Sequence, residues 1–258
     1  MIDHTAHFRR EVLAFERAVR PVGEAPAVPS CPGWTVTDLI MHLGWVHRYV
    51  ARIVEERLAG PPGTAERDFL GLPAESAAWP DPMKAPNPGP VPEGLVSWFA
   101  DGAERLASLL DVDARVWTWS REQSVGFWAR MQTIEAALHR WDAQLATGVP
   151  EPVDAELAAD AVAQTFEVMA PARRSWKQAP PGEGERYLFR RTDGPDAWTV
   201  TFDGDEITMN TEKSADVEVS GSASDLMLFL WQRIPADRLT INGDETRIER
   251  YFELVPPV

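Results

Sequence analysis

Glu135 and His139 stand four residues apart in the stretch Glu–Ala–Ala–Leu–His. Side chains at this spacing project from the same face of a helix. The carboxylate and the imidazole can then each donate a lone pair to one metal ion. Two ligands do not complete a metal site, so a further ligand must come from another part of the chain. The chain has five histidines in all: His4, His7, His42, His47 and His139.

The helix that must carry this pair is predicted by the spacing of its apolar residues. They recur every three or four positions, as in a helix packed into a bundle. The stripe consists of Phe127, Met131, Ile134, Leu138, Trp141 and Leu145. At 100° per residue, Trp128, Glu135, His139 and Asp142 fall together on its flank. The candidate ligands therefore border a helical core.

The same periodicity predicts amphipathic helices at residues 8–19, 36–58, 95–110 and 125–145. In the second helix, Thr35 and Asp38 form a capping pattern. His42 and His47 lie on opposite flanks of its apolar stripe, about 140° apart, so one ion could hardly take both. Helix geometry alone does not choose between these two histidines.

A change of period marks a second half of the chain. A proline-rich connection at 60–92 is too rich in proline for regular structure, and a fifth helix is predicted at about 155–169. A Pro/Gly patch at 180–184 precedes residues that alternate with period two. Strands are predicted at 187–191, 198–202, 206–210, 216–220 and 239–242, with Asp203–Gly204 as a hairpin turn.

Two helices complete the prediction for this half. One is capped by Ser222 and runs to about residue 233, and the other spans 245–255. The predicted class is therefore α+β, with a four-helix bundle in residues 1–150 and a small α+β domain in 151–258.

Composition limits the partners and the compartment. The formal net charge is −15, so the average surface repels nucleic-acid phosphates and anionic lipid headgroups. We expect neither nucleic acid nor a membrane as a partner. A secretion signal and an apolar span of about twenty residues are both missing from the sequence, and the lone Cys31 fits a reducing compartment. These features predict a cytoplasmic protein.

Three motifs carry a family resemblance. They are CPGWTVTDLIMHL from Cys31 to Leu43, EAALHRWD from Glu135 to Asp142, and ADVEVSG from Ala215 together with DLMLFLWQR, which ends at Arg233. In this order they resemble the mycothiol-dependent maleylpyruvate isomerase family of actinobacteria. The resemblance implies a DinB-like four-helix bundle followed by a sterol-carrier-like α/β domain.

The resemblance also implies a site. The ligands of a divalent ion, usually zinc, would be His42, Glu135 and His139, which selects His42 over His47. Arg233 matches an arginine that the second domain contributes to the thiol site, and mycothiol would be the thiol cosubstrate. Two imidazoles and one carboxylate leave zinc an open position, where a thiol loses its proton and becomes a nucleophile.

The thiolate would add to an electrophilic small molecule, giving isomerisation or S-transfer, which share this step. Arg233 would hold a substrate carboxylate or stabilise a developing enolate, and Asp142 would orient His139. Each residue also has a simpler interpretation. The Glu135–His139 pair can be a solvated pair without metal, Asp142 can pair with Arg140, and Arg233 can serve a helix end. Cys31 is expected to pack as a small hydrophobe.

Two other functions remain as alternatives. A zinc hydrolase would use metal-bound water as its nucleophile, as other DinB-like bundles do. A non-enzymatic protein would hold an apolar ligand in the sterol-carrier-like half. The predicted ligand set argues against the second alternative, and the fused carboxy-terminal domain argues against the first.

Overall fold

The computed structural model describes residues 2–63, 68–210, 214–244 and 246–257. The chain forms two compact units, Met1–Glu151 and Pro152–Val258. The first unit is helical and the second contains a five-stranded mixed sheet, so the predicted α+β class is confirmed.

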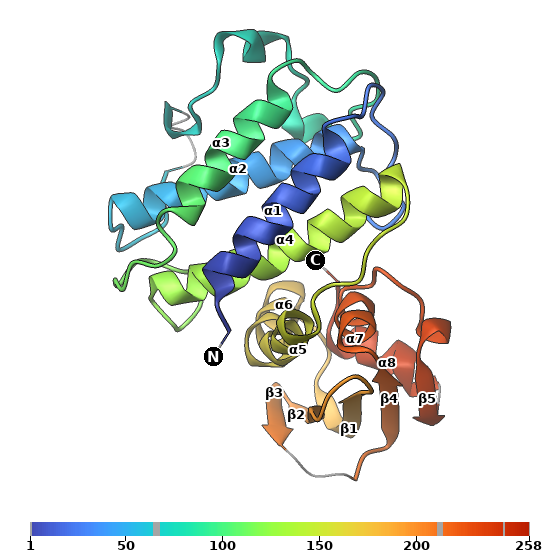
Figure 1. Ribbon diagram of the computed structural model, residues 1–258. Coiled ribbons are helices and arrows are strands. Elements are labelled where there is room, and N and C mark those ends of the chain that lie inside the picture. The colour runs from blue at the N-terminus through green and yellow to red at the C-terminus, as the bar shows by residue number, and fades with distance from the viewer. Residues whose placement is uncertain (1, 64–67, 211–213, 245, 258) are drawn as a thin grey trace. The chain divides into compact units, whose positions relative to one another are not determined.

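The N-terminal unit contains the four predicted helices (Figure 1). They are α1 (His4–Val19), α2 (Val36–Glu55), α3 (Leu95–Ala107) and α4 (Val125–Thr147). Helix α1 begins four residues before its predicted start, because the Asp3 carboxylate accepts a hydrogen bond from the Ala6 amide at 2.9 Å and caps the first turn. The apolar stripes meet in a core that includes fully buried Phe8, Leu43 and Phe99.

The start of α2 is fixed by the predicted capping pair. The Thr35 amide donates to Asp38 Oδ2 at 2.8 Å, which completes the capping box. Asp38 also accepts hydrogen bonds from the Asn87 amide at 3.0 Å and from Asn87 Nδ2 at 2.7 Å. Burial alone would raise the pKa of Asp38, but these hydrogen bonds lower it below its usual value. The end of the proline-rich connection is thereby tied to α2.

The connection itself is more regular than predicted. Its described residues include three short 3-10 helices, η1 (Asp68–Leu70), η2 (Ala74–Ala78) and η3 (Pro82–Lys84). Residues 64–67 lie outside the described part of the chain. Trp98 Nε1 of α3 donates to the Leu70 carbonyl at 2.9 Å, which anchors η1 against the bundle. Prolines prevented long helices here, but single 3-10 turns tolerate them.

The C-terminal unit has a sheet of order β3-β2-β1-β4-β5 with its helices gathered on one face (Figure 1). Strands β1 and β4 are parallel and the other neighbours are antiparallel. The strands are β1 (Gly182–Arg191), β2 (Ala197–Gly204), β3 (Glu206–Asn210), β4 (Val217–Gly221) and β5 (Thr240–Gly243). Tyr187, Phe189 and Phe202 of the sheet are fully or almost fully buried and pack around Tyr251 of α8 (Thr246–Leu254).

Several predicted boundaries of this unit were wrong. Strand β1 begins at Gly182, inside the predicted Pro/Gly patch, because Gly182 pairs with Gly204 of β2. The hairpin turn lies one residue later than predicted, since Asp203 pairs with Glu206. The predicted start of the last helix at residue 245 lies outside the described residues.

The predicted fifth helix is longer than expected. It consists of α5 (Ala155–Gln164), a π-helical turn (Thr165–Met169) and α6 (Ala170–Lys177). The helix capped by Ser222 is shorter than expected, because α7 (Ala223–Leu230) ends three residues before Arg233.

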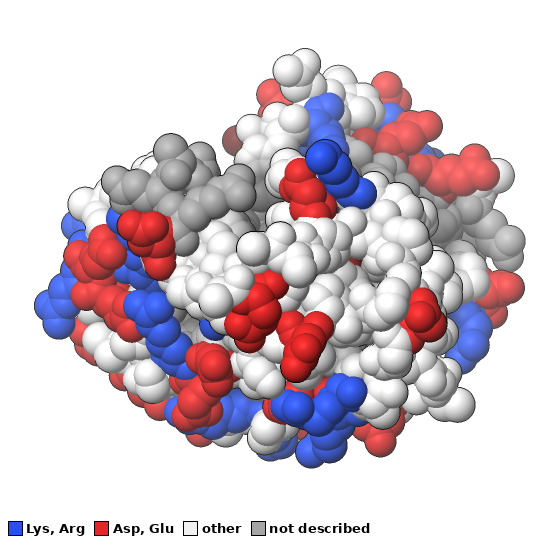
Figure 2. Space-filling model, turned by 90° about the horizontal axis from the view of Figure 1, so that it is seen from above, with Lys and Arg blue, Asp and Glu red and all other residues white. Residues whose placement is uncertain are grey.

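Surface charge is mixed despite the net charge. On the face drawn in Figure 2, acidic and basic side chains are interspersed among large uncharged areas. Among the described helices, none combines the length and the apolar character that crossing a bilayer requires.

Candidate metal site and its surroundings

Helices α2 and α4 bring His42, Glu135 and His139 together. One potential ligand atom from each side chain lies within 4.8 Å of the others. His42 Nε2 lies 3.0 Å from Glu135 Oε1. The pair on α4 is thus joined by the histidine of α2 that the family resemblance selected.

The ring orientation of His139 is set by Asp142, one turn further along α4. His139 Nδ1 lies 2.9 Å from Asp142 Oδ2, and the Asp142 side chain is fully buried. A histidine that binds a metal commonly donates its other ring nitrogen to a carboxylate in this way. The structure thus contains the expected pairing of Asp142 with His139, and Arg140 Nε donates to Glu11 Oε2 at 2.7 Å.

Two supporting residues, Ser30 and Gln132, were missed from the sequence, and a third, Cys31, was expected only to pack as a small hydrophobe. Ser30 Oγ donates to Asp142 Oδ1 at 2.6 Å, and Cys31 Sγ donates to Asp142 Oδ2 at 3.3 Å. Gln132 Nε2 donates to Glu135 Oε2 at 2.7 Å. The spacing of Gln132, one turn before Glu135, was a signal that could have been used. No local pattern relates Ser30 to Asp142, which is 112 residues away.

Cys31, His139 and Asp142 form a second group of potential ligands within 4.8 Å of one another. In this group both other side chains lie against the same oxygen, Asp142 Oδ2. These contacts use the Nδ1 side of the His139 ring and leave Nε2 for the group with His42 and Glu135. The second group therefore supports the first and does not compete with it.

The protonation states favour cation binding. Burial alone would raise the pKa of Glu135, but the hydrogen bond with His42 and the nearby imidazoles lower it to about 2. Burial lowers the pKa of His139, although the contact with Asp142 opposes this effect. A carboxylate and a neutral imidazole are the forms that bind metals.

His47, the alternative on α2, lies in the hydrophobic core. Its ring contacts Phe8 at 5.1 Å and Phe99 at 5.6 Å between centroids, and it is fully buried. Neither ring nitrogen has a hydrogen-bond partner among the described residues. Burial lowers the pKa of His47 to about 3, so the ring is neutral at physiological pH.

Trp34 covers one side of the cluster. Its ring stacks near His139 with centroids 6.3 Å apart and planes inclined by 20°, and it lies 5.1 Å from His42. Trp34 belongs to the turn that precedes α2, so the motif from Cys31 to His42 contributes a potential ligand, an aromatic ring and a hydrogen-bond donor to Asp142.

Arg233 belongs to the C-terminal unit and is described with that unit. It follows α7 in a Schellman turn. The Arg233 amide donates to the Leu228 carbonyl and the Gln232 amide to the Phe229 carbonyl, both at 2.8 Å. Gln232 has φ of 56°, the left-handed conformation that usually favours glycine at this position. Arg233 Nη1 donates to the Trp231 carbonyl at 2.9 Å.

Arg173 of α6 supports this turn from the core. Its guanidinium lies 4.1 Å from the centre of the Trp231 ring, and Nη1 donates to the Leu230 carbonyl at 3.4 Å. Burial lowers the pKa of Arg173 to about 10. The cation–π contact therefore holds a charged group against the end of α7.

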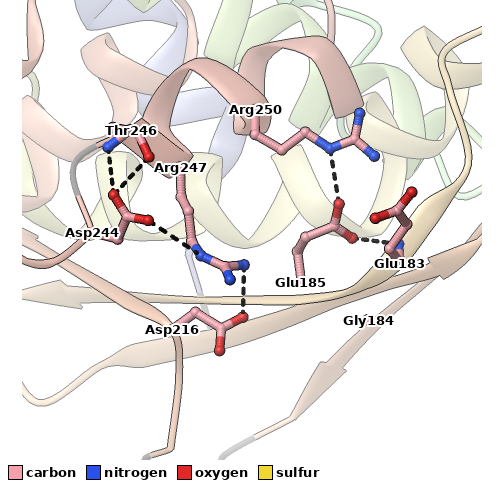
Figure 3. A pocket seen from close by; sticks show the side chains of 8 residues that line it. All are labelled: Glu183, Gly184, Glu185, Asp216, Asp244, Thr246, Arg247 and Arg250. Carbon is pink, nitrogen blue, oxygen red and sulfur yellow. Dashed lines mark hydrogen bonds and ion pairs between the residues drawn. The ribbon is translucent and has the colours of Figure 1, made fainter.

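A surface hollow of the C-terminal unit contains none of the predicted site residues (Figure 3). Arg247 Nη1 lies 3.3 Å from Asp216 Oδ2, and Arg250 Nε lies 2.8 Å from Glu185 Oε1. Its guanidinium groups are thus directed at carboxylates of the same hollow.

The donor set of the helical cluster fits a divalent metal. Two imidazoles and one carboxylate converge, which is a common ligand set of catalytic zinc and leaves a further position for a substrate. Glu135 has no ion pair with lysine or arginine among the described residues, and its contacts are with His42 and Gln132. A cation would compensate this partly buried charge.

Comparison with known proteins identifies the family. The model of the mycothiol maleylpyruvate isomerase N-terminal domain matches residues 5–144, and that of the corresponding C-terminal domain matches residues 156–250. A crystal structure of the mycothiol-dependent maleylpyruvate isomerase is similar, with a TM-score of 0.59 and 14% identity, covering 93% of this chain and 92% of that one. A structure of its histidine-to-alanine mutant has a TM-score of 0.57 and 13% identity over the same shares. No curated protein matches the sequence. The matched family models span both units, and the chain therefore belongs to the mycothiol maleylpyruvate isomerase family.

Proposed function

We propose that this protein is a metal-dependent enzyme that activates mycothiol as a thiolate for addition to an electrophilic small molecule. The observation that carries the proposal is the convergence of His42, Glu135 and His139, with Asp142 holding the far side of the His139 ring. Membership of the family supports thiol-dependent isomerisation as the reaction class.

His42, Glu135 and His139 would hold the metal, with zinc as the best match to two imidazoles and a carboxylate. A divalent cation held by these residues would lower the pKa of an entering thiol, which would favour the thiolate at neutral pH. Glu135 and His139 need not release protons first, because their pKa values are already lowered. Asp142 fixes the His139 ring and thereby the direction of its free nitrogen.

Addition of the thiolate to an activated double bond makes the former double bond rotatable, and its departure restores the double bond and the free thiol. This sequence consumes no oxidant or reductant. If the thiol remains attached, the product is an S-conjugate and the enzyme is an S-transferase. In either reaction negative charge develops on the electrophile's oxygen, and Arg233 is our candidate to stabilise it or to bind a substrate carboxylate.

The function is tested on protein purified without a histidine tag. Metal content is measured by mass spectrometry, and mycothiol is titrated calorimetrically into the metal-loaded protein. We expect about one zinc per chain and saturable thiol binding that disappears after chelation. Zinc without thiol binding would instead favour a hydrolase with metal-bound water. Protein that binds neither would contradict the proposal.

Maleylpyruvate is the first electrophile to test, because it is named for the structurally similar enzyme. Turnover that requires both mycothiol and metal would establish isomerisation. Thiol consumption without isomerised product would establish S-transfer. The role of Arg233 is tested with Arg233→Lys, because this variant keeps the positive charge and removes the bidentate geometry of the guanidinium.

A further inference from the structure

An aromatic strip lies in the N-terminal unit, partly on the two helices that carry the candidate metal site. We define the strip by five rings, those of Trp45, Tyr49, Phe69, Trp117 and Trp128. Trp45 and Tyr49 stack with centroids 5.0 Å apart and planes inclined by 16°. Phe69 lies 6.5 Å from each of these two rings.

The strip begins on the helical face that carries His42. At 100° per residue, Trp45 is rotated by about 60° and Tyr49 by about 20° from His42. The two aromatic residues therefore follow the histidine along one side of α2. Seven residues of helix place Tyr49 about 10 Å from His42 along the axis.

The other helix of the site leads to the same rings. Trp128 precedes Glu135 by seven residues on α4 and is rotated from it by about 20°. Trp117 joins the two helices, with its ring 6.5 Å from Tyr49 and 6.2 Å from Trp128. Trp128 Nε1 also donates to the Trp117 carbonyl at 2.8 Å. By helical spacing, the aromatic strip therefore follows the candidate site along both α2 and α4.

Exposure separates this strip from ordinary core. Trp45 is 36% exposed, whereas Trp128 is only 4% exposed and forms the buried part of the strip. Tyr49, Phe69 and Trp117 are half-buried. Burial raises the pKa of Tyr49, so its ring is uncharged at neutral pH. The strip offers flat, uncharged surface to a ligand, and flat apolar groups gain most from such contacts.

One cation beside these rings is already engaged. The Arg52 guanidinium lies 5.3 Å from the centre of the Phe69 ring, and its Nε donates to Glu56 at 3.1 Å. Aromatic faces carry partial negative charge, so an anionic group would gain little there. Between an anionic and an uncharged group, the strip therefore fits an uncharged aromatic or other planar apolar group.

From these observations we infer that the aromatic strip binds the apolar part of the electrophile, and that Trp45 and Tyr49 determine specificity for substrates with an aromatic group about one or two helical turns from the reacting carbon. This inference rests on the proposed function for the identity of the site. The binding of an aromatic ring to the strip is measurable without turnover.

The test uses two unreactive ketones, benzylacetone and butanone, which differ by one phenyl ring. Dissociation constants are measured by ligand-observed NMR titration on the full-length protein. We expect benzylacetone to bind at least about tenfold more tightly than butanone. Trp45→Ala and Tyr49→Ala should each weaken benzylacetone binding about fivefold and leave butanone unchanged.

Two variants serve as controls. Tyr49→Phe keeps the ring and should retain benzylacetone affinity. Leu13→Ala removes an apolar side chain that is 52% exposed on α1 and should also have no effect. Melting temperatures and circular dichroism verify that each variant is folded.

Equal affinity for the two ketones would overturn the inference. A preference for benzylacetone that survives both Trp45→Ala and Tyr49→Ala would overturn it as well, because the ring would then bind elsewhere. Metal content and mycothiol titration of the same samples report separately on the proposed function. Failure of one proposal is therefore distinguishable from failure of the other.

Discussion

Two clusters of charged side chains in this protein have opposite arrangements. In the hollow of the C-terminal unit, Asp216 faces Arg247 and Glu185 faces Arg250 (Figure 3). In the candidate metal site, Glu135 faces an imidazole and a neutral amide. In the hollow these two carboxylates each have a guanidinium partner, whereas in the helical site two imidazoles and a carboxylate converge. The two clusters therefore differ in the partner that each carboxylate has.

Burial separates the two clusters only in part. The side chain of Asp216 is 31% exposed and that of Arg247 is 40% exposed, so water screens their attraction. Glu185 is 8% exposed but already has Arg250 as its partner. Glu135 is 19% exposed and His139 is 10% exposed, where a charge is less screened than at Asp216. Because the contacts of Glu135 are with His42 and Gln132, an added cation gains more at the helical site.

The largest effect is expected from substitutions of the two histidines in the candidate metal site. His42→Ala or His139→Ala should weaken zinc binding more than about 100-fold, because the proposed site would lose one of its three protein ligands. Folding should survive, since the apolar stripe of α4 is unchanged. Metal content by mass spectrometry measures the effect, with Glu185→Gln in the hollow as control. Full metal content in both histidine variants would contradict the assignment.

A second substitution tests whether Asp142 strengthens metal binding by His139. Asp142→Asn should weaken zinc binding by about 10- to 100-fold, because the His139 ring loses its charged acceptor. Competition with a chromophoric chelator measures the dissociation constant. Ser30→Ala, which removes one donor to Asp142, should have a smaller effect. An unchanged constant in Asp142→Asn would assign Asp142 a purely structural role.

A third prediction concerns the histidine outside the site. The folded-state pKa of His47 is about 3 and its unfolded value is about 6.5, so between these values the unfolded chain binds more protons. Stability of the metal-free protein should fall as pH decreases through this range. His47→Leu should reduce that slope by up to about 1.4 kcal/mol per pH unit.

Urea unfolding at several pH values from neutral to mildly acidic measures this slope. Above neutral pH the parent and His47→Leu curves should run parallel, because His47 is then neutral in both states. Equal slopes in mild acid would show that His47 titrates normally and is not held in the core.

The smallest effect is expected in the hollow. Arg247→Ala should change the free energy of unfolding by less than about 1 kcal/mol, because the side chains of Arg247 and Asp216 are 40% and 31% exposed and such ion pairs contribute little. The change should diminish at high salt. Urea unfolding at two salt concentrations measures it. If metal or mycothiol affinity fell as well, the two clusters would not be independent.

The sequence predicted the helix that carries the site better than the contacts around it. The period of the α4 stripe placed Phe127, Ile134 and Leu138 in the core, and all three are buried. This worked because helical phase depends only on local spacing. The contact of Ser30 with Asp142 depends on tertiary folding, and local spacing contains no information about it.

Strands and helix ends in the C-terminal unit show the same limit. Gly182 belongs to β1 because its ladder partner overrides a sequence typical of a loop. The helix predicted to end at 169 continues through Pro171, which lies in the first turn of α6 after the π-helical turn. Proline has no backbone N–H to donate, and this is tolerated here because the preceding π-helical turn already alters the helical hydrogen bonding. Neither outcome follows from propensity.

At the candidate site, the family resemblance chose between two histidines that the helical periodicity could not distinguish. Helix geometry left His42 and His47 as equal alternatives, because both flank the same stripe. The structure places His42 beside Glu135 and His47 between Phe8 and Phe99. Which flank faces which helix is decided by the packing of the whole bundle.

The left-handed residue before Arg233 has a consequence for local motion. Gln232 lacks the conformational freedom of glycine, so its φ of 56° costs about 1 kcal/mol. The contacts of Arg173 with Leu230 and Trp231 offset that cost from outside the turn. The end of α7 is therefore stabilised in part by a side chain from another helix, α6. Its amide protons should exchange with solvent more readily than those in the middle of the same helix.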